Sequence, residues 1–184
     1  MRRKLRVLAG RHPAASVALA DSQSVKGTVH AGNGHDGNKK VNGRKRHILV
    51  CTMGFLLNVV LSPANTSEKE GLRERLAGLW EDCPRLKLIR TDQGYRLGED
   101  FKNYIFAAYA WLIEMVIRPK DQKGFVVIPQ RWVVERTFAW LGNYRRLSKD
   151  YETLEQSSEA FIYMAMVDLM TKRLAGTSTP AFRS

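Results

Sequence analysis

The sequence predicts an α/β protein in which a mixed β-sheet is flanked by helices. Short apolar runs follow one another early in the chain, strand-like and helical patterns then alternate, and two helical patterns come last. The 184 residues, 44% of them hydrophobic, suffice for one core. We therefore expect one domain over residues 15–175, after a basic lead-in (1–14) and before a flexible tail (176–184).

Three strands are expected first. Their apolar runs cover residues 15–25, 47–52 and 55–65. Met53 and Gly54 separate the last two runs, as in a hairpin. The stretch 27–45 is rich in Gly and Asn and has no apolar period, so we expect an exposed, mobile loop there.

Helices and strands alternate over the rest of the chain. Thr66 or Ser67 can cap a helix that runs to Trp80, with Glu68 and Glu70 in its first turn, where the helix dipole favours acids. The later elements are a strand at 86–95, a helix at 98–110, a strand at 111–119 stopped by Pro119, and helices at 130–146 and 155–173. The order βββαβαβα is that of the ribonuclease H-like fold, which alone does not define a function.

The charge of the chain indicates a polyanionic partner. A formal net charge of +12 and a pI near 10 favour DNA, RNA or an anionic membrane surface, with nucleic acid as the leading candidate. The longest apolar stretch, 106–117, has 12 residues and contains Glu114, whereas a membrane helix needs roughly 20. Because no secretory signal is present either, we expect a cytoplasmic protein. Cys51 and Cys83 predict neither a zinc site nor a disulfide framework.

One acid interrupts the apolar stretch RWVVERTFAWL at residues 131–141. At about 100° per residue, Glu135 lies opposite the apolar stripe of the predicted helix. The stripe consists of Val133, Val134, Thr137, Trp140, Leu141, Tyr144 and Leu147. The face of Glu135 carries Arg131, Ala139, Gly142 and Arg146, with Trp132 and Phe138 at its flanks. The small residues next to the acid leave room for a bulky anion, and the arginines supply positive charge to hold it.

A structural interpretation competes with this one. Glu135 could belong to a solvated helix face or pair with Arg131. Asp92 could start a turn, and Asp21 could end a strand. Trp132 and Phe138 could stack on an unpaired base or simply pack. Taken together, three acids at the ends of two strands and on a late helix indicate a site for Mg²⁺, which prefers carboxylate oxygens and supports phosphodiester chemistry.

Four blocks of the sequence resemble one family. ADSQSVKG (20–27), KKVNGRKRHILV (39–50), TDQGYR (91–96) and IPQRWVVERTFAWLGNYRRLSKDYE (128–152) are similar to the catalytic domain of DDE transposases of bacterial insertion sequences, in the insertion sequence five group. The resemblance extends from about residue 10 to residue 175. It implies a ribonuclease H-like core.

The resemblance also implies a catalytic triad, Asp21, Asp92 and Glu135, which would bind Mg²⁺, with Mn²⁺ as a substitute. Asp21 and Asp92 would share one or both ions, and Glu135 would complete the second. The implied reaction is cleavage at transposon ends followed by attack of the freed 3′-OH on target DNA. In the wider signature Tyr-x2-Arg-x3-Glu-x6-Lys, Arg131 matches, whereas Ile128 and Gly142 replace Tyr and Lys.

Double-stranded DNA, as terminal inverted repeats and as target, is the implied partner, bound by a homodimer. The basic residues expected to contact phosphates are Lys39, Lys40, Arg44, Lys45, Arg46, Arg131, Arg145, Arg146 and Lys149. Only 20 residues precede Asp21, so we expect either the second reading frame of a two-frame element or a truncated remnant. A silent DNA-binding remnant and a nuclease without strand transfer stay open as alternatives.

Overall fold

The computed structural model describes residues 1–28, 32–76, 79–92, 95, 97–116 and 131–176. The predicted tail at 177–184 lies outside them. The helices are α1 (Arg2–Leu8), α2 (Glu68–Leu76), α3 (Leu79–Asp82), α4 (Glu99–Tyr109), α5 (Arg131–Gly142), the short 3₁₀ helix η2 (Arg145–Leu147) and α6 (Glu155–Leu174). The strands are β1 (Val17–Lys26), β2 (Gly34–Asp36), β3 (Val41–Cys51), β4 (Leu56–Pro63), β5 (Leu88–Thr91) and β6 (Leu112–Met115).

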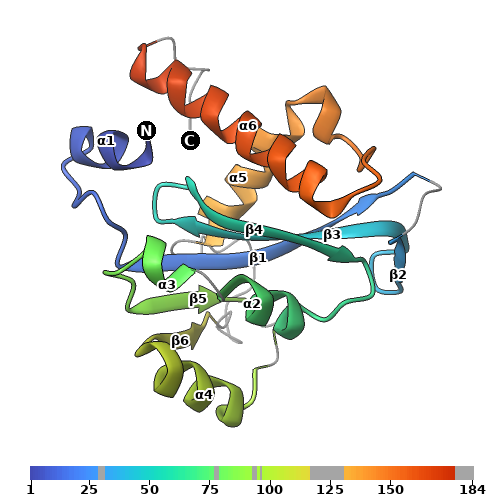
Figure 1. The fold of residues 1–184 in the computed structure, drawn as a ribbon, viewed down its shortest axis with the longest axis horizontal. Coiled ribbons are helices and arrows are strands. Elements are labelled where there is room, and N and C mark those ends of the chain that lie inside the picture. Colours follow the sequence, from blue (N-terminus) through green and yellow to red (C-terminus); the bar gives the residue numbers. More distant parts are fainter. Residues whose placement is uncertain (29–31, 77–78, 93–94, 96, 117–130, 177–184) are drawn as a thin grey trace, which may run out of the picture.

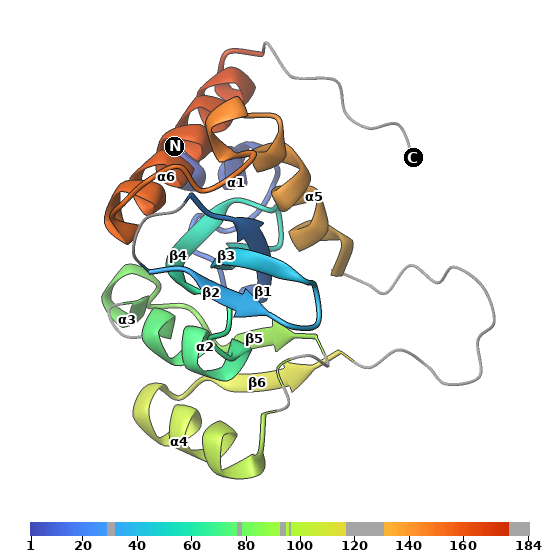
Figure 2. The same cartoon turned by 90° about the vertical axis from the view of Figure 1, so that its right-hand side faces the viewer.

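A mixed sheet organises the molecule, as predicted. Its strand order is β2-β3-β1-β5-β6, and β4 pairs with residues 44–50 of β3. β1, β3 and β4 pair in antiparallel fashion, whereas β5 and β6 run parallel to β1. Helices α1, α5 and α6 lie on one side of this sheet, and α2, α3 and α4 lie on the other (Figures 1 and 2). The antiparallel meander followed by parallel strands confirms the predicted α/β class.

The turn between β3 and β4 matches the predicted hairpin. Gly54 has a φ of 82°, a left-handed conformation that costs little without a Cβ atom. The backbone N–H of Cys51 donates to the carbonyl of Phe55 at 2.9 Å, which closes the turn. Cys51 is fully buried. Cys51 and Cys83 are both free thiols.

The mobile loop predicted at 27–45 is wrong for most of its described part. Residues 34–36 form β2, and β3 begins at Val41, well before the apolar run at 47–52. The cause is pairing: β1 continues through its polar end to Lys26, and β3 pairs with it from Cys51 to Gly43. A long antiparallel ladder satisfies the backbone groups of both strands without an apolar pattern.

The described helices follow the sequence pattern, and one further helix was not predicted. The backbone N–H of Glu70 donates to Ser67 Oγ at 3.2 Å, and the Glu70 carboxylate accepts from the Ser67 N–H at 3.2 Å. This capping box confirms Ser67 as the N-cap residue of α2. The helix expected to reach Trp80 corresponds to α2 and α3, and residues 77 and 78 between them lie outside the described residues. The lead-in, for which no element was predicted, forms α1 over Arg2–Leu8 and contacts α6.

One core joins the sheet to both helical layers. β3 contributes a run of four fully buried residues, Ile48 to Cys51, and α6 buries Ile162 and Met166 against the same cluster. In the described part of the chain, no helix is both long enough and apolar enough to cross a membrane.

Candidate active site

Asp21 lies in β1, and Asp92 directly follows the neighbouring parallel strand β5. Leu19 of β1 pairs with Arg90 of β5, and this is the last pair of the ladder. Asp21 and Asp92 each lie two residues beyond it in the chain, Asp21 within β1 and Asp92 after the end of β5. Adjacent strands are about 4.8 Å apart. Three buried residues, Ala18 to Ala20, precede Asp21, which is itself half-buried and accepts a hydrogen bond from the Ser22 N–H at 2.7 Å. The sheet therefore brings two carboxylates to one edge of the core.

Glu135 reaches the same region from α5. Four residues of the predicted stripe, Val133, Val134, Thr137 and Leu141, lie on α5 and are at most 3% exposed. Tyr144 and Leu147 lie beyond the end of α5, so the prediction that they share this helix is wrong. Glu135 is exposed on the opposite side. The Thr137 hydroxyl lies 2.9 Å from the carbonyl oxygens of both Gly54 and Val133, so it ties α5 to the β3–β4 turn. This anchoring fixes the direction in which Glu135 points.

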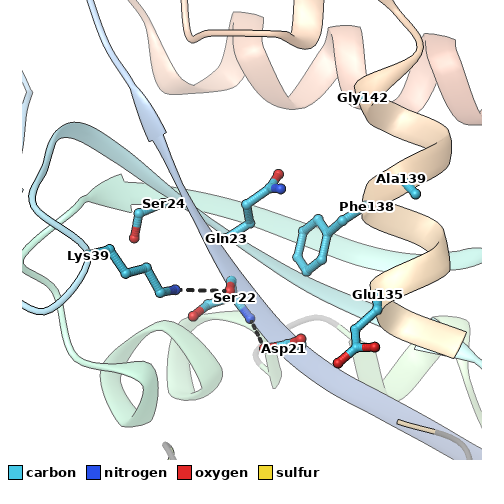
Figure 3. Close-up of a pocket in the computed structure, with 9 residues that line it drawn as sticks. All are labelled: Asp21, Ser22, Gln23, Ser24, Lys39, Glu135, Phe138, Ala139 and Gly142. Atoms are coloured by element: carbon cyan, nitrogen blue, oxygen red, sulfur yellow. Dashed lines mark hydrogen bonds between the residues drawn. The ribbon is translucent and has the colours of Figure 1, made fainter. Parts of the chain in front are cut away.

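A groove separates β1 from α5. Figure 3 shows the carboxylates of Asp21 and Glu135 pointing toward each other at one end of it. The groove has a volume of about 570 Å³ and is lined by Asp21, Ser22, Gln23, Ser24, Lys39, Glu135, Phe138, Ala139 and Gly142. Ala139 and Gly142 are the small residues predicted to leave room below the acid. Asp92 does not line this groove, so the structure brings two of the three predicted acids together and places the third directly after the adjacent strand β5.

The polar residues of β1 were missed as a group by sequence reasoning. Ser22, Gln23 and Ser24 follow Asp21 in the block ADSQSVKG and line the groove. The signal that could have revealed them is the long polar end of a strand that begins apolar. Because hydroxyl and amide groups can both donate and accept hydrogen bonds, they suit a polar ligand in the groove.

Lys39 is positioned by Asp36, another residue that the sequence did not indicate. The Asp36 carboxylate accepts hydrogen bonds from the backbone N–H groups of Asn38 and Lys39 at 3.1 Å and from the Ser24 hydroxyl at 2.5 Å. Burial alone would raise the pKa of Asp36, but these hydrogen bonds and the charges of Lys45 and Lys39 outweigh it, and the pKa is lowered. The anionic Asp36 thus holds the turn that brings Lys39 to the groove.

The structure buries Arg44, Lys45 and Arg46, which we expected from the sequence to contact DNA phosphates. All three are at most 5% exposed. The Lys45 ammonium donates to the Glu68 carboxylate at 3.0 Å and to the Thr66 carbonyl at 2.8 Å. Since a buried charge needs internal partners, these side chains are used to hold the fold together rather than to face a ligand.

Arg44 and Arg46 bind the segment that follows α5. Arg46 donates to the carbonyls of Leu147 and Lys149 at 2.8 and 3.2 Å. Arg44 forms an ion pair with Asp150 at 3.1 Å and donates to two further carbonyls of this segment. Burial lowers the pKa of Arg46 to about 10, although the Asp150 charge acts in the opposite direction. Two arginines of β3 therefore determine the path of residues 147–153.

The cations on this segment and on β2–β3 are exposed. Arg145, Arg146 and Lys149 lie at the surface, as do Lys39 and Lys40. Arg146 forms an ion pair with Glu152 at 2.7 Å, and it lies in η2 rather than on α5, which ends at Gly142. The prediction that Arg146 shares a helix face with Glu135 is therefore wrong. The side chain of Arg131 lies outside what the structure describes.

The donors at the site fit a hard divalent cation. Asp21, Asp92 and Glu135 offer only carboxylate oxygens, which Mg²⁺ and Mn²⁺ prefer. Among the described residues, no three or more His, Cys, Asp and Glu side chains lie close enough to form a metal-binding group. The chemistry of the donors is thus suited to an ion, with Asp21 and Glu135 as the pair that already faces a common space.

Comparison with known proteins identifies relatives over most of the chain. The family model described as the transposase DDE domain matches residues 12–169. A protein of Burkholderia cepacia assigned to insertion sequence element IS402 as its transposase is 29% identical over 128 residues. That alignment covers 65% of this chain and 59% of the relative, so the chain spans less than two thirds of the length of the protein it matches.

Solved structures share the fold. A chain of the simian T-cell lymphotropic virus intasome, in complex with PP2A regulatory subunit B56 gamma, superposes with a TM-score of 0.56 at 14% identity, covering 85% of this chain and 49% of that one. The catalytic core domain of BIV integrase gives a TM-score of 0.47 at 15% identity, covering 84% and 83%. The fold is the ribonuclease H-like fold predicted from the order of elements.

Proposed function

Because this chain belongs to the transposase DDE domain family, we propose that it is the catalytic part of a transposase that cleaves DNA at transposon ends and transfers the cut strand into target DNA. The observation that carries the proposal is that Asp21 and Glu135 line one open groove, while Asp92 directly follows β5, the strand next to β1. Since the chain spans 59% of its relative, the activity of a complete transposase is itself part of the proposal.

The three carboxylates would hold the metal. Proteins of this family generally use divalent ions, and we propose Mg²⁺, with Mn²⁺ as a substitute. Asp21 and Asp92 would bind one ion between two strands, and Glu135 would complete the second from α5. When bound, two such ions supply an activated oxygen nucleophile and stabilise the leaving oxygen of a phosphodiester. The rigid anchoring of α5 through Thr137 keeps the third carboxylate in register with the other two.

The exposed cations would hold the DNA. We propose phosphate contacts for Lys39, Lys40, Arg131, Arg145, Arg146 and Lys149, whereas Arg44, Lys45 and Arg46 act indirectly by shaping the surface. Lys39 lines the groove itself, and Lys149 lies on the segment that Arg46 binds. The DNA partners would be terminal inverted repeats and target duplex, with binding that weakens steeply as salt rises. A DNA-acting bacterial protein of this kind would work in the cytoplasm, at the nucleoid.

Residues 15–175 would form the catalytic unit, and a homodimer would bring two transposon ends together. The isolated bridge between Gly27 and Asp150 ties the end of β1 to the segment after α5, so the proposed unit includes both sides of the groove. The α1 helix packs against α6, which extends this unit at its N-terminal side.

The test is metal-dependent cleavage and joining of DNA that carries the element's terminal inverted repeats. Wild type is compared with Asp92→Asn, and Asp82→Asn, an exposed acid of α3, is the matched control. We expect cleaved and joined products from wild type and Asp82→Asn with Mg²⁺ or Mn²⁺, and none from Asp92→Asn. Cleavage without joining would identify a nuclease without strand transfer. If all three proteins are inactive while a fusion with the upstream frame cleaves and joins, the chain is not a self-sufficient enzyme; if the fusion is inactive as well but binds DNA, the chain is a silent DNA-binding remnant.

A further inference from the structure

Lys39 brings a positive charge into the groove from the side opposite α5. The groove is lined by residues of β1 and α5 and by Lys39, which lies in the turn between β2 and β3. Of the described residues that line it, Lys39 is the single cation, whereas Asp21 and Glu135 are acids. Figure 3 shows the Lys39 side chain reaching toward Ser22, the neighbour of Asp21. The groove thus combines two acids at one end with one lysine.

The turn fixes the backbone of Lys39 and leaves its ammonium group available to a ligand. The Asp36 carboxylate accepts hydrogen bonds from the backbone N–H groups of Asn38 and Lys39 at 3.1 Å. The next residue, Lys40, has a φ of 52°. The Lys39 ammonium lies 3.5 Å from the Ser22 carbonyl oxygen, close to the longest separation for a hydrogen bond. Among the described residues, this ammonium forms no ion pair with a carboxylate.

The α5 side of the groove is open at the end of the helix. Gly142 is the last residue of α5 and follows Glu135 by seven residues, which corresponds to about 10 Å along the helix axis. A Cβ atom at Gly142 would meet no neighbouring heavy atom within 4 Å. The wider signature has Lys at this position, whereas Gly leaves the last turn of α5 without a basic residue. The cation of the groove therefore comes from the turn between β2 and β3.

The groove is long enough for more than one phosphate. Consecutive nucleotides of one DNA strand advance about 3.4 Å along the duplex axis, so about 10 Å of α5 spans roughly three of them. In the proposed reaction, the phosphate nearest Asp21 and Glu135 is the one that is cut. The two acids also repel the phosphates next to it. A cation on the other side of the groove offsets this repulsion.

We propose that Lys39 binds the DNA phosphate next to the one that is cut and thereby positions the strand for cleavage. An ammonium group donates charge-assisted hydrogen bonds to phosphate oxygens, and the flexible stem of lysine lets it reach along the groove. This role rests on the proposed function, since it assigns one contact of the same DNA strand.

The first experiment measures binding by fluorescence anisotropy to a labelled duplex that carries the element's terminal inverted repeat. Ca²⁺ replaces Mg²⁺, because it occupies carboxylate sites with a less exacting geometry. Two further duplexes each have one neutral methylphosphonate, on one or the other side of the phosphate at the cut position. The full chain is compared with Lys39→Met, which removes the charge. Lys87→Met, at an exposed position just before β5, is the matched control, and circular dichroism checks each fold.

We expect Lys39→Met to bind the unmodified duplex roughly 10-fold more weakly than wild type. The slope of log K against log salt should become shallower by about 0.9, the value for one phosphate contact. One of the two methylphosphonate duplexes should weaken wild type by a similar factor and leave Lys39→Met unchanged, because that contact is already lost. Equal affinities of Lys39→Met and Lys87→Met would overturn the proposal. Equal weakening of wild type and Lys39→Met by both methylphosphonates would also overturn it.

The second experiment moves the cation to the α5 side of the groove. Gly142 is exposed and has free space around it, so a lysine fits there. Cleavage of the unmodified duplex with Mg²⁺ is measured in a single turnover. Lys39→Met combined with Gly142→Lys should recover part of the rate that Lys39→Met loses, whereas Lys39→Met combined with Gly142→Gln should not. Lys39→Arg should cleave faster than Lys39→Met. Equal rates in all four variants would show that charge in the groove does not position the strand.

Failure of this role can be told from failure of the proposed function, because the binding assay needs no cleavage. A methylphosphonate effect that disappears in Lys39→Met supports the phosphate contact even if wild type cleaves no DNA. Cleavage that depends on Asp92, combined with binding by Lys39→Met equal to that of Lys87→Met, supports the transposase and rejects the contact.

Discussion

The guanidinium of Arg44 and the carboxylate of Asp150 form an ion pair at 3.1 Å, with only 4% and 3% of their side chains exposed. The two residues come from β3 and from the segment between η2 and α6. Asp150 also accepts a hydrogen bond from the Ser158 hydroxyl, and its backbone N–H donates to the Lys26 carbonyl at 2.8 Å. The pair therefore connects the sheet, the segment after α5 and the start of α6.

Breaking this pair should destabilise the whole domain. In Asp150→Asn, the Arg44 charge stays buried without its carboxylate, and we expect the free energy of unfolding to fall by about 3–5 kcal/mol. Urea denaturation followed by circular dichroism measures it. The matched control is Glu99→Gln, which breaks the exposed pair with Lys102 and should change stability little. An equal, small effect of both substitutions would contradict the structural role of the pair.

Thr137 should couple stability to the position of Glu135. Thr137→Val keeps the shape of a fully buried side chain but removes the hydroxyl between the Gly54 and Val133 carbonyls, so we expect a loss of about 1–2 kcal/mol in unfolding free energy. DNA cleavage should fall further than stability explains, because α5 loses its tie to the β3–β4 turn. Thr137→Ser, which restores the hydroxyl, should recover most of the cleavage rate. Unimpaired cleavage by Thr137→Val would show that Glu135 is positioned without this contact.

Asp36 should make part of the stability dependent on acid pH. Its pKa in the folded chain lies below the ordinary value of 3.8, so its contribution is present above 3.8 and is lost as the pH falls through the lower, folded-state pKa. The difference in unfolding free energy between wild type and Asp36→Asn should therefore shrink as the pH is lowered below 3.8. Asp82→Asn, at an exposed position, is the charge-matched control. If the difference in unfolding free energy between wild type and Asp36→Asn stays constant as the pH falls below 3.8, Asp36 does not have a lowered pKa in the folded chain.

Filling the groove should block DNA cleavage while the fold is kept. Ala139 is exposed and lines the groove, so the indole of Ala139→Trp can occupy the groove without displacing core residues. We expect loss of cleavage with an unchanged midpoint of thermal unfolding. Ala108→Trp, at an exposed position of α4, is the control and should cleave normally. Normal cleavage by Ala139→Trp would mean that the substrate does not enter this groove.

Local patterns in the sequence predicted the elements that bury apolar faces. The stripe on α5 and the capping box at Ser67 depend only on neighbouring residues, so helical periodicity and cap chemistry suffice to predict them. Asp21 and Asp92 were predicted as candidates, but their relative placement depends on the pairing of β1 with β5, which the sequence does not display.

Contacts between distant parts of the chain could not be predicted in the same way. β2 and the early start of β3 form because a polar strand end pairs across the sheet, which leaves no apolar pattern. The sequence indicates a surface cation at Arg44, because its partner Asp150 lies 106 residues further along the chain and is not evident from the sequence. The contact of the Arg173 guanidinium of α6 with the ring of Trp140 on α5 likewise joins residues that are far apart in the sequence.

The central claim is that Asp92 binds the same metal as Asp21, and the most direct measurement is the cleavage rate of Asp92→Cys with Mg²⁺ and with Mn²⁺. Mg²⁺ is a hard ion that accepts thiolate poorly, whereas Mn²⁺ lies further along the series toward ions that bind sulfur. Wild type should cleave with both ions. We expect Asp92→Cys to be inactive with Mg²⁺ and to regain measurable cleavage with Mn²⁺. Cleavage by Asp92→Cys with Mg²⁺ at the wild-type rate would contradict the claim.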